Sequence, residues 1–476
     1  MDFISVTYLL FLIILLFVYY VTPKNKQWIV LLVFSVIFYS CFSLTMWFGM
    51  LLTAVTTYAY ARFGKHSKGM LIATIILNIG IMLGLKTATS GLGFVQVIGL
   101  DRLAFLLPVG ISFYTLQTIA YMVDVYRKKT EPQKNFLKYL LFIIFFPQIL
   151  QGPIPRYEEL GNQLYSGHTY DEKNVQSGLY LILWGFFQKM VIADRCNIVV
   201  NHIYENYERY DGLYFWIAAV LYSIQLYTDF AGCVSIASGS AEALGIHLSQ
   251  NFNHPYFAMS IKEFWHRWHM SLSGFLKDYV YIPLGGNRKG KIRKWCNILI
   301  TFGISGIWHG IGTHFLIWGL LHGVYQVMGE ILQPLKAFGM RVTGMVKDST
   351  AHRFVARLFT FFLVMVAWIF FRAENTSKAI YVTTHLFGKW NPWILVSGDL
   401  YTLGLREEEW TLLLLCMIIL VVVAMVHEKN ISIREHVIKQ PLFFRWVILY
   451  VVIFAILIAG IYGPGYDSAQ FIYGGF

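Results

Sequence analysis

Long apolar runs recur along the whole length of this 476-residue chain. Runs of about 17 to 25 apolar residues have the length that a helix needs to cross the hydrocarbon core of a bilayer. Only 13% of the residues are charged, whereas a soluble domain carries about a quarter. The sequence therefore predicts an all-α polytopic membrane protein with about 11–13 transmembrane or re-entrant helices. We place its candidate spans at residues 6–22, 28–44, 46–61, 70–86, 105–125, 137–151, 177–200, 213–232, 297–320, 354–372, 411–427 and 444–462.

Short basic loops separate several of these spans. They lie at residues 24–26, 62–68, 127–129 and 287–294. Cytoplasmic loops are enriched in Lys and Arg, so we expect these four loops to face the cytoplasm and the N-terminus to face the outside. The same loops explain the net charge of +12, and we expect no nucleic-acid partner. The five cysteines have no paired spacing and are expected to be buried thiols.

Two stretches place histidines where the chain is otherwise largely apolar. One is IKEFWHRWHMSLSGFLKDYVYIPLGG, residues 261–286, and the other is GISGIWHGIGTHFLIWGLLHG, residues 303–323. An ionisable side chain at membrane depth costs free energy, and so it marks a functional site by default. Two structural elements can bring His269 of the first stretch and His309 of the second into one pocket.

His309, in the motif GIWHG, is the first candidate for chemistry. A neutral imidazole accepts a proton near pH 7, as a general base must; a hydrogen-bonded core histidine is the alternative. His314 and His322 would share one face of an unbroken helix, with His309 about 140° away from His314. One helix therefore presents all three histidines to one pocket only if the glycines at 303–312 break it. Those glycines are also suited to close helix packing.

Residues 253–286 are too polar to span a membrane. Their large apolar side chains recur at helical spacing, which predicts an interfacial amphipathic helix with His266 and His269 on a shared face. His269 would orient the substrate or polarise a carbonyl oxygen as charge develops on it. The alternative role is an interfacial hydrogen bond, and His266 is expected to be a surface residue.

Two further segments carry polar groups within apolar surroundings. FFPQILQGPIPRY, residues 145–157, contains three prolines, which end or kink helices. It is either a span that ends in a loop or a re-entrant segment beside the site, with Arg156 pointing inward. Asp229, in LYTDFAG, has Arg156, Lys189 and Arg195 as candidate ion-pair partners, or it orients a histidine. A structural salt bridge and a catalytic role both remain open for Asp229.

Other chemistries have weaker support in the sequence. His269, His309 and His322 could converge on a metal ion or a haem, but Glu is absent from the HExxH positions, and zinc sites usually need three or four clustered ligands. We therefore expect no metal. A proton-coupled transporter or flippase would use intramembrane His and Asp groups, but inverted repeats are not evident. No GxSxG, P-loop or dinucleotide fingerprint occurs in a supporting context.

At these motifs the chain resembles the membrane-bound O-acyltransferase family, in particular the branch that includes the membrane subunit of alginate O-acetyltransferase. The resemblance runs nearly end to end. It is carried by PVGISFYTLQTIAYMVDVYR, FFPQILQGPIPRY, LYTDFAG, NFNHPYFAMSIKEFWHRWHMSLSGFLKDYVYIPLGGNRKG, GIWHG, WGLLHG and the terminal FIYGGF. Together these segments are specific, although each alone is a weak signal.

The resemblance implies one membrane domain, residues 1–476, whose helices surround a central tunnel. Residues 1–130 would form N-terminal spans, 131–330 the core that carries the motifs, and 331–476 the C-terminal spans. The family's invariant histidine falls on His309 and its second motif position on His269. These two are the predicted catalytic residues. The predicted substrate-binding residues are Arg156, Asp229, His322, Trp308, Arg288 and Lys289.

The activity implied is transfer of an acyl group, most commonly acetyl, from a cytoplasmic thioester such as acetyl-CoA to hydroxyls of an extracytoplasmic polysaccharide. No resident cofactor is expected, because the thioester is a substrate. An extracytoplasmic partner of the SGNH-hydrolase type and the bilayer are the implied partners, with the bacterial plasma (inner) membrane as location. PLGGNRKG favours this branch over the D-alanyl transferase of teichoic acid synthesis, which is the alternative. Arg288 and Lys289 would attract a phosphate-bearing donor.

Overall fold

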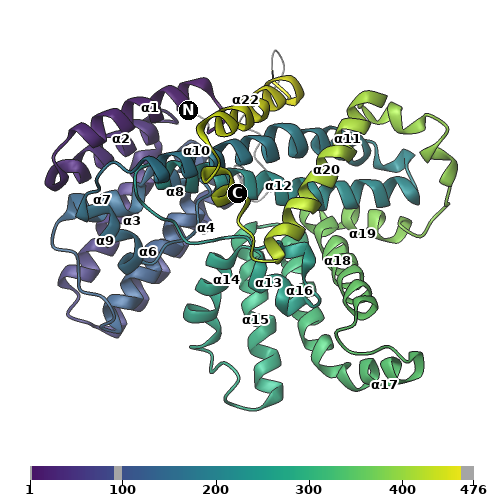
Figure 1. The fold of residues 1–476 in the computed structure, drawn as a ribbon. Helices are drawn as coiled ribbons and strands as arrows, with labels where there is room; N and C mark the ends of the chain where they lie inside the picture. Colours follow the sequence, from purple (N-terminus) through teal and green to yellow (C-terminus); the bar gives the residue numbers. More distant parts are fainter. Residues whose placement is uncertain (1–2, 90–98, 463–476) are drawn as a thin grey trace. The chain divides into compact units, whose positions relative to one another are not determined.

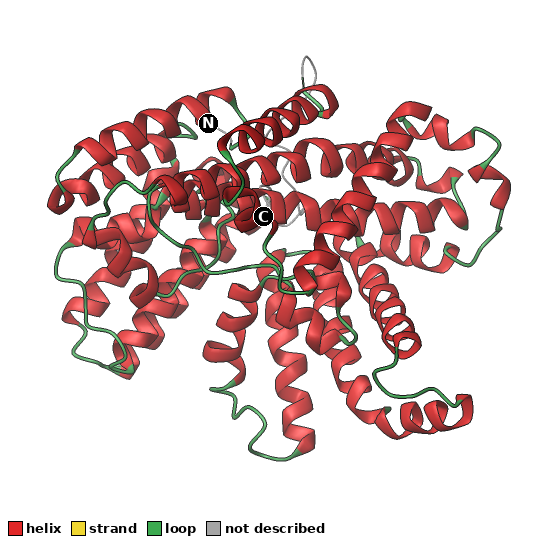
Figure 2. Cartoon of the chain, viewed as in Figure 1, coloured by secondary structure: helices red, strands yellow, loops and turns green. Residues whose placement is uncertain are grey.

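The computed structural model describes residues 3–89 and 99–462. Within those ranges the regular elements are helices and no strand occurs (Figure 2). The predicted all-α fold is therefore confirmed. The terminal FIYGGF, which contributes to the family resemblance, lies outside the described residues.

The chain divides into two compact units. The first consists of Met1–Gln188, Phe230–Ser249 and Ser432–Phe476, and the second of Lys189–Asp229 and Gln250–Ile431. Both histidine stretches belong to the second unit. The predicted division of the domain at residues 130 and 330 stays a prediction.

The first unit contains the N-terminal helices and the last two helices of the described chain (Figure 1). Its helices are α1 (Val6–Val21), α2 (Gln27–Ser40), α3 (Met46–Phe63), α4 (Lys68–Ala88), α6 (Ile111–Tyr126), α7 (Phe136–Ile144), α8 (Phe146–Ile149), α9 (Tyr157–Ser166), α10 (Glu172–Phe186), the end of α12 (Leu213–Ala243), α21 (Ile433–Ile438) and α22 (Leu442–Ala459).

The second unit carries the motif segments. Its helices are the π-helix η3 (Phe187–Ala193), of which all but the first two residues belong to this unit, α11 (Asp194–Glu205), the start of α12, α13 (Ile261–Arg267), α14 (Met270–Leu276), the π-helix η6 (Lys277–Tyr281), α15 (Lys291–His309), α16 (Thr313–Ile331), α17 (Gln333–Thr343), α18 (Thr350–Arg372), α19 (Thr376–His385) and α20 (Glu407–Glu428).

Six helices in the described ranges are long and apolar enough to cross a membrane. They are α4, the helical stretch Glu172–Glu205, α12, α18, α20 and α22. Helices α16 and α17 add a seventh if they form one span bent by 60°. These are fewer than the predicted total of about 11–13 transmembrane or re-entrant helices. Several predicted ranges fold as shorter apolar helices, such as α1 with 16 residues and α2 with 14.

The predicted break in the proline-rich segment is confirmed. Helix α7 ends at Ile144, and after Phe145 only the four residues of α8 are helical before residues 150–156 continue without regular structure. The Gln117 amide nitrogen donates to the carbonyl oxygen of Phe142 at 2.7 Å, so polar groups of the first unit satisfy the backbone there. Broken backbone is tolerated in a membrane protein when it is buried in this way.

The range 297–320, predicted as one span, is two helices instead. Helix α15 ends at His309, Gly310 takes an extended conformation, and α16 begins at Thr313. The two helices lie side by side, because glycines allow their backbones to approach. A Cβ on Gly306 would lie 2.4 Å from the Phe315 carbonyl oxygen. Both roles considered for the glycines, breaking the helix and close packing, are therefore observed.

The amphipathic helix predicted within residues 253–286 is interrupted. Helix α13 ends at Arg267 and α14 starts at Met270, with His269 between them in the left-handed conformation at φ 42°. The expected shared face of His266 and His269 is therefore wrong: His266 is exposed, whereas His269 is fully buried. A single residue at positive φ interrupts a right-handed helix, and side-chain periodicity does not reveal it.

Candidate active site

His309 lies among aromatic rings at the end of α15. It is 2% exposed. Its ring centroid is 4.6 Å from that of Trp308, 4.8 Å from that of Trp318 and 5.2 Å from that of Phe371. The helix break at Gly310 folds α16 back along α15, which brings Trp318 to His309. His309 is thus a buried residue of the second unit, enclosed by these three aromatic side chains.

His269 reaches the same group of rings from the other motif segment. Its ring centroid lies 6.3 Å from that of Trp308, and so Trp308 stands beside both predicted catalytic histidines. The imidazole is 0% exposed. Burial lowers the pKa of His269 to about 3, so the ring is neutral near pH 7.

Asn251 holds His269 in place and was not singled out from the sequence. Its Oδ1 lies 3.2 Å from His269 Nδ1, and its carbonyl oxygen accepts a hydrogen bond from the Met270 N–H at 2.9 Å. The available signal was the position of Asn251 in the motif NFNHPYF, just before the first histidine stretch. Polar side chains next to a buried histidine commonly fix its orientation.

His322 joins the ring cluster through α16. Its ring centroid is 5.3 Å from that of Trp318, which also contacts His309. The Trp265 indole N–H donates to His322 Nδ1 at 3.3 Å, and the Phe264 ring stacks on the imidazole with a 4° angle between the planes. The structure therefore brings His269, His309 and His322 into one aromatic cluster. Their catalytic and substrate-binding roles stay predictions.

His314 and His266 are the other two histidines of these stretches. His314 is buried, and its ring packs against that of Phe315 with centroids 4.3 Å apart. His266 projects from α13 into exposed surroundings. The exposed position of His266 agrees with the surface residue expected there.

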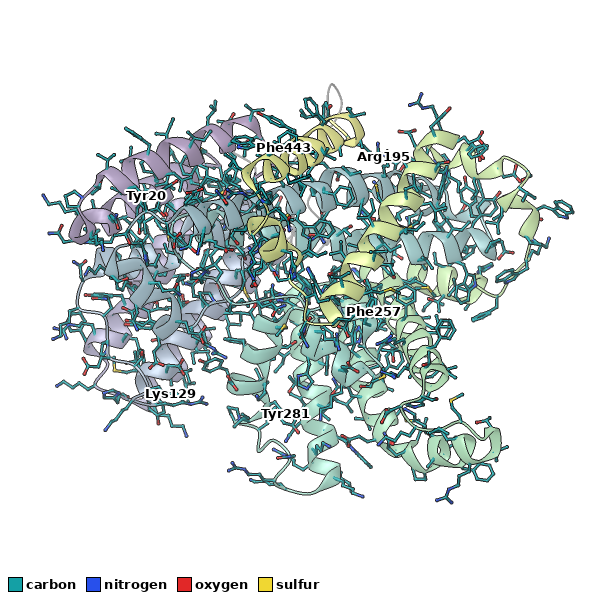
Figure 3. All side chains as sticks on the ribbon, in the orientation of Figure 1. Tyr20, Lys129, Arg195, Phe257, Tyr281 and Phe443 are labelled. Carbon is teal, nitrogen blue, oxygen red and sulfur yellow. The ribbon has the colours of Figure 1, made fainter. Side chains whose placement is uncertain are left out.

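Asp229 forms a buried ion pair with one of its three candidate partners. Its Oδ1 lies 2.7 Å from Lys189 Nζ, and the same ammonium is 2.9 Å from Asp194 Oδ1. Lys189 stands in the π-helix η3, and Arg195, labelled in Figure 3, donates to the Val191 carbonyl oxygen at 3.0 Å. This arrangement favours the structural interpretation of Asp229, although its predicted substrate contact stays a prediction.

The remaining predicted binding residues, Arg156, Arg288 and Lys289, lie outside the two histidine stretches of the sequence. Arg288 and Lys289 are exposed in the loop before α15, whose Gly286 carbonyl oxygen accepts from the Asn297 amide at 2.9 Å. Arg156 is the half-buried N-cap residue of α9, in the first unit. The part played by these three cations stays a prediction.

In residues 3–89 and 99–462, no group of three or more acidic, histidine or cysteine side chains is arranged to hold a metal ion. In addition, the Trp265 N–H occupies the lone pair of His322 Nδ1.

Comparison with known proteins adds independent support for the family. A sequence model of the membrane-bound O-acyltransferase family matches residues 132–338, which include all three clustered histidines. A protein of Pseudomonas putida named a probable alginate O-acetylase AlgI is 34% identical over 403 residues, covering 80% of this chain and 79% of that protein. The protein of the same name from Azotobacter vinelandii is 34% identical over 432 residues, covering 87% and 82%.

A third relative is named for a different polymer. The peptidoglycan O-acetyltransferase of Helicobacter pylori is 35% identical over 315 residues, covering 60% of this chain and 58% of that protein. The similarity extends over most of both chains for the first two relatives, and it includes the segments that form the histidine cluster. This chain belongs to the membrane-bound O-acyltransferase family and is a polytopic membrane enzyme of the O-acyltransferase class.

Proposed function

We propose that this protein transfers an acetyl group from a cytoplasmic thioester, acetyl-CoA, to hydroxyls of an extracytoplasmic polysaccharide. Relatives named for alginate and for peptidoglycan support this assignment, because both names describe acetylation of a carbohydrate polymer. The observation that carries the proposal is His309, buried among Trp308, Trp318 and Phe371 in the part of the chain that the family model matches.

In the proposed reaction His309 is the general base. Its imidazole removes the proton from an acceptor hydroxyl as that oxygen attacks the thioester carbonyl. The new C–O bond forms, the C–S bond breaks, and the proton passes from the imidazole to the departing thiolate. The surrounding rings favour transfer over hydrolysis, because they keep water away from the thioester.

His269 and Trp308 complete the proposed site. His269 either orients the acceptor hydroxyl or polarises the thioester carbonyl. Trp308, beside both histidines, would form the wall against which the acyl group lies. His322 and Asp229 are proposed substrate contacts of this site. Arg156, in the first unit, is separately proposed to contact substrate.

The donor is proposed to arrive from the cytoplasm at the exposed loop before α15. Arg288 and Lys289 extend into solvent there, and exposed cations raise the local concentration of a phosphate-bearing ligand such as CoA. The acceptor would be modified on the outer side of a bacterial plasma membrane, with the N-terminus on that side. Transfer is direct or passes through an SGNH-hydrolase-type partner.

The test is turnover of acetyl-CoA by purified protein, read as release of the CoA thiol together with loss of radiolabelled acetyl. We expect His309→Ala to lower the rate by about 10²–10⁴-fold, the range that a positioned base supplies. The matched control is His266→Ala, because His266 is exposed on the neighbouring motif, and it should retain the wild-type rate. Wild-type turnover by His309→Ala would remove His309 from the mechanism. Turnover only with D-alanyl carrier protein would instead favour the teichoic acid alternative.

A further inference from the structure

The side-chain oxygen of Asn251, Oδ1, lies within hydrogen-bond distance of three atoms of the His269 segment. Its Oδ1 lies 2.8 Å from Ser271 Oγ, 3.1 Å from Ser271 N and 3.2 Å from His269 Nδ1. The residue itself is 1% exposed. A buried amide oxygen surrounded in this way leaves little freedom for the groups that face it.

The Ser271 backbone decides which end of the Asn251 amide points toward His269. A backbone N–H is always a donor, so the Asn251 atom that it meets must be the oxygen and not the NH₂ group. The same oxygen faces His269 Nδ1, and an oxygen without hydrogen can only accept. His269 Nδ1 therefore carries the proton. Because the buried ring is neutral, its Nε2 holds the lone pair.

His322 provides an internal contrast. The group that faces its Nδ1 is the Trp265 indole N–H, which is a donor only. His322 Nδ1 therefore holds the lone pair, and its proton is on Nε2. Two buried histidines of one cluster thus have opposite tautomers, each set by a neighbouring side chain.

The backbone around Asn251 keeps the amide in register with His269. The Met270 N–H donates to the Asn251 carbonyl oxygen, and the Asn253 N–H donates to the Arg267 carbonyl oxygen, both at 2.9 Å. Arg267 in turn forms ion pairs with Glu263 and with Glu428 of α20. Residues 251–253 are therefore tied to both sides of the helix break at which His269 sits.

We propose that Asn251 is a positioning residue that holds His269 in the Nδ1–H tautomer, so that His269 Nε2 accepts a hydrogen bond from the acceptor hydroxyl. This assignment favours the orienting role of His269 over polarisation of the carbonyl. Its Nε2 carries no proton, so it cannot donate a hydrogen bond to a carbonyl oxygen. The tautomer follows from the contacts alone. The role toward the hydroxyl rests on the function proposed above.

The first experiment reads the tautomer without any substrate. Full-length protein is labelled with ¹⁵N-histidine, and the His269 signals are identified by their loss in His269→Gln. The wild type should show a protonated Nδ1 and an unprotonated Nε2. Asn251→Asp, which retains an acceptor oxygen, should keep that pattern, whereas Asn251→Leu should lose it. Asn253→Ala is the matched control, because the Asn253 side chain is exposed, and it should match the wild type. A wild-type His269 protonated on Nε2 would overturn the proposal.

The second experiment separates positioning from folding and from the proposed function. We expect Asn251→Leu to lower kcat for acetyl transfer by about 10- to 100-fold, as loss of a partner that orients a histidine does at other sites. The KM for acetyl-CoA should stay at the wild-type value. Because a smaller folded fraction would also lower kcat at an unchanged KM, the rates are normalised to the folded protein that thermal unfolding in detergent detects. An unchanged kcat with an altered tautomer would contradict the role toward the hydroxyl. If the predicted tautomer is found but acetyl-CoA is not turned over by the wild type, the function fails and the tautomer assignment stands.

Discussion

His269 and His322 are both fully buried in one aromatic cluster, but their neighbours differ in kind. A polar segment, with Asn251 as its centre, surrounds His269 Nδ1. An indole N–H and the face of Phe264 surround His322. Burial alone therefore does not decide what a histidine can do. The neighbouring side chain decides which nitrogen donates and which accepts.

The two histidines also differ in backbone conformation. His269 sits at a helix break, in a left-handed conformation that a non-glycine residue adopts only when its surroundings hold it there. His322 sits within a regular helix, α16, where no such restraint is needed. We infer that the position of His269 requires a strained backbone conformation, whereas side-chain packing alone holds His322.

The largest expected effect is on activity at His269. His269→Ala should lower acetyl-CoA turnover by about 10²–10⁴-fold, because it removes the nitrogen that we propose accepts a hydrogen bond from the acceptor hydroxyl. Initial rates with purified protein measure this effect, with His266→Ala as the control. If His322→Ala lost as much activity as His269→Ala, the proposed difference between the two histidines would not hold.

The buried ion pairs of Lys189 should contribute more to the stability of the fold than the hydrogen bonds of either histidine do. Lys189→Met leaves Asp194 and Asp229 without the ammonium that lies between them. The free energy of unfolding should fall by about 3–5 kcal/mol, the usual cost of breaking a buried ion pair. Thermal unfolding in detergent is the measurement. Lys129→Met is the control, because Lys129 is exposed and its Nζ lies 4.0 Å from Asp124 Oδ1. Equal losses of unfolding free energy in the two variants would contradict this prediction.

A smaller effect on stability is expected at His322. His322→Phe keeps an aromatic ring in the cluster but removes the acceptor for the Trp265 N–H, which should lower the free energy of unfolding by about 1–3 kcal/mol. His322→Gln can restore an acceptor and should recover part of the loss. The same thermal measurement applies. A His322→Phe protein as stable as the wild type would show that the indole hydrogen bond is not needed.

The smallest effect is expected at the exposed loop. Replacing Arg288 and Lys289 by Ala should raise the KM for acetyl-CoA while kcat stays unchanged, because we propose that these side chains only attract the donor before the chemical step. The increase should shrink as salt is added, since exposed charges are screened within about 8–10 Å at physiological ionic strength. Lys347→Ala, at another exposed lysine, is the control. A lower kcat in the double variant would place the loop in the chemistry itself.

Much of the fold could be predicted from the sequence, because apolar length reports directly on helices. The range 354–372, for example, matches α18, and the range 411–427 matches α20. Residues 297–320 were predicted as one span, and helical geometry gave a glycine break only as the condition for bringing His309, His314 and His322 to one pocket; the break occurs at Gly310. Lys189 was also among the expected partners of Asp229.

The details around His269 were not accessible in the same way. Periodicity continues through Trp265 and Trp268 as if one helix were present, and no glycine or proline marks the left-handed residue. The contact of Asn251 with His269 depends on how the chain folds back, which residue spacing does not encode. Sequence reasoning identified the histidine and missed the side chain that sets its tautomer.

The central claim is that this histidine cluster makes an ester bond to a carbohydrate hydroxyl, and the product tests it most directly. Membranes that contain the protein are incubated with [1-¹³C]acetyl-CoA and a polysaccharide acceptor, and the polymer is analysed by ¹³C NMR. The account predicts an O-acetyl ester signal with the wild type and with His266→Ala, and none with His309→Ala. An ester signal of equal size with His309→Ala would contradict it.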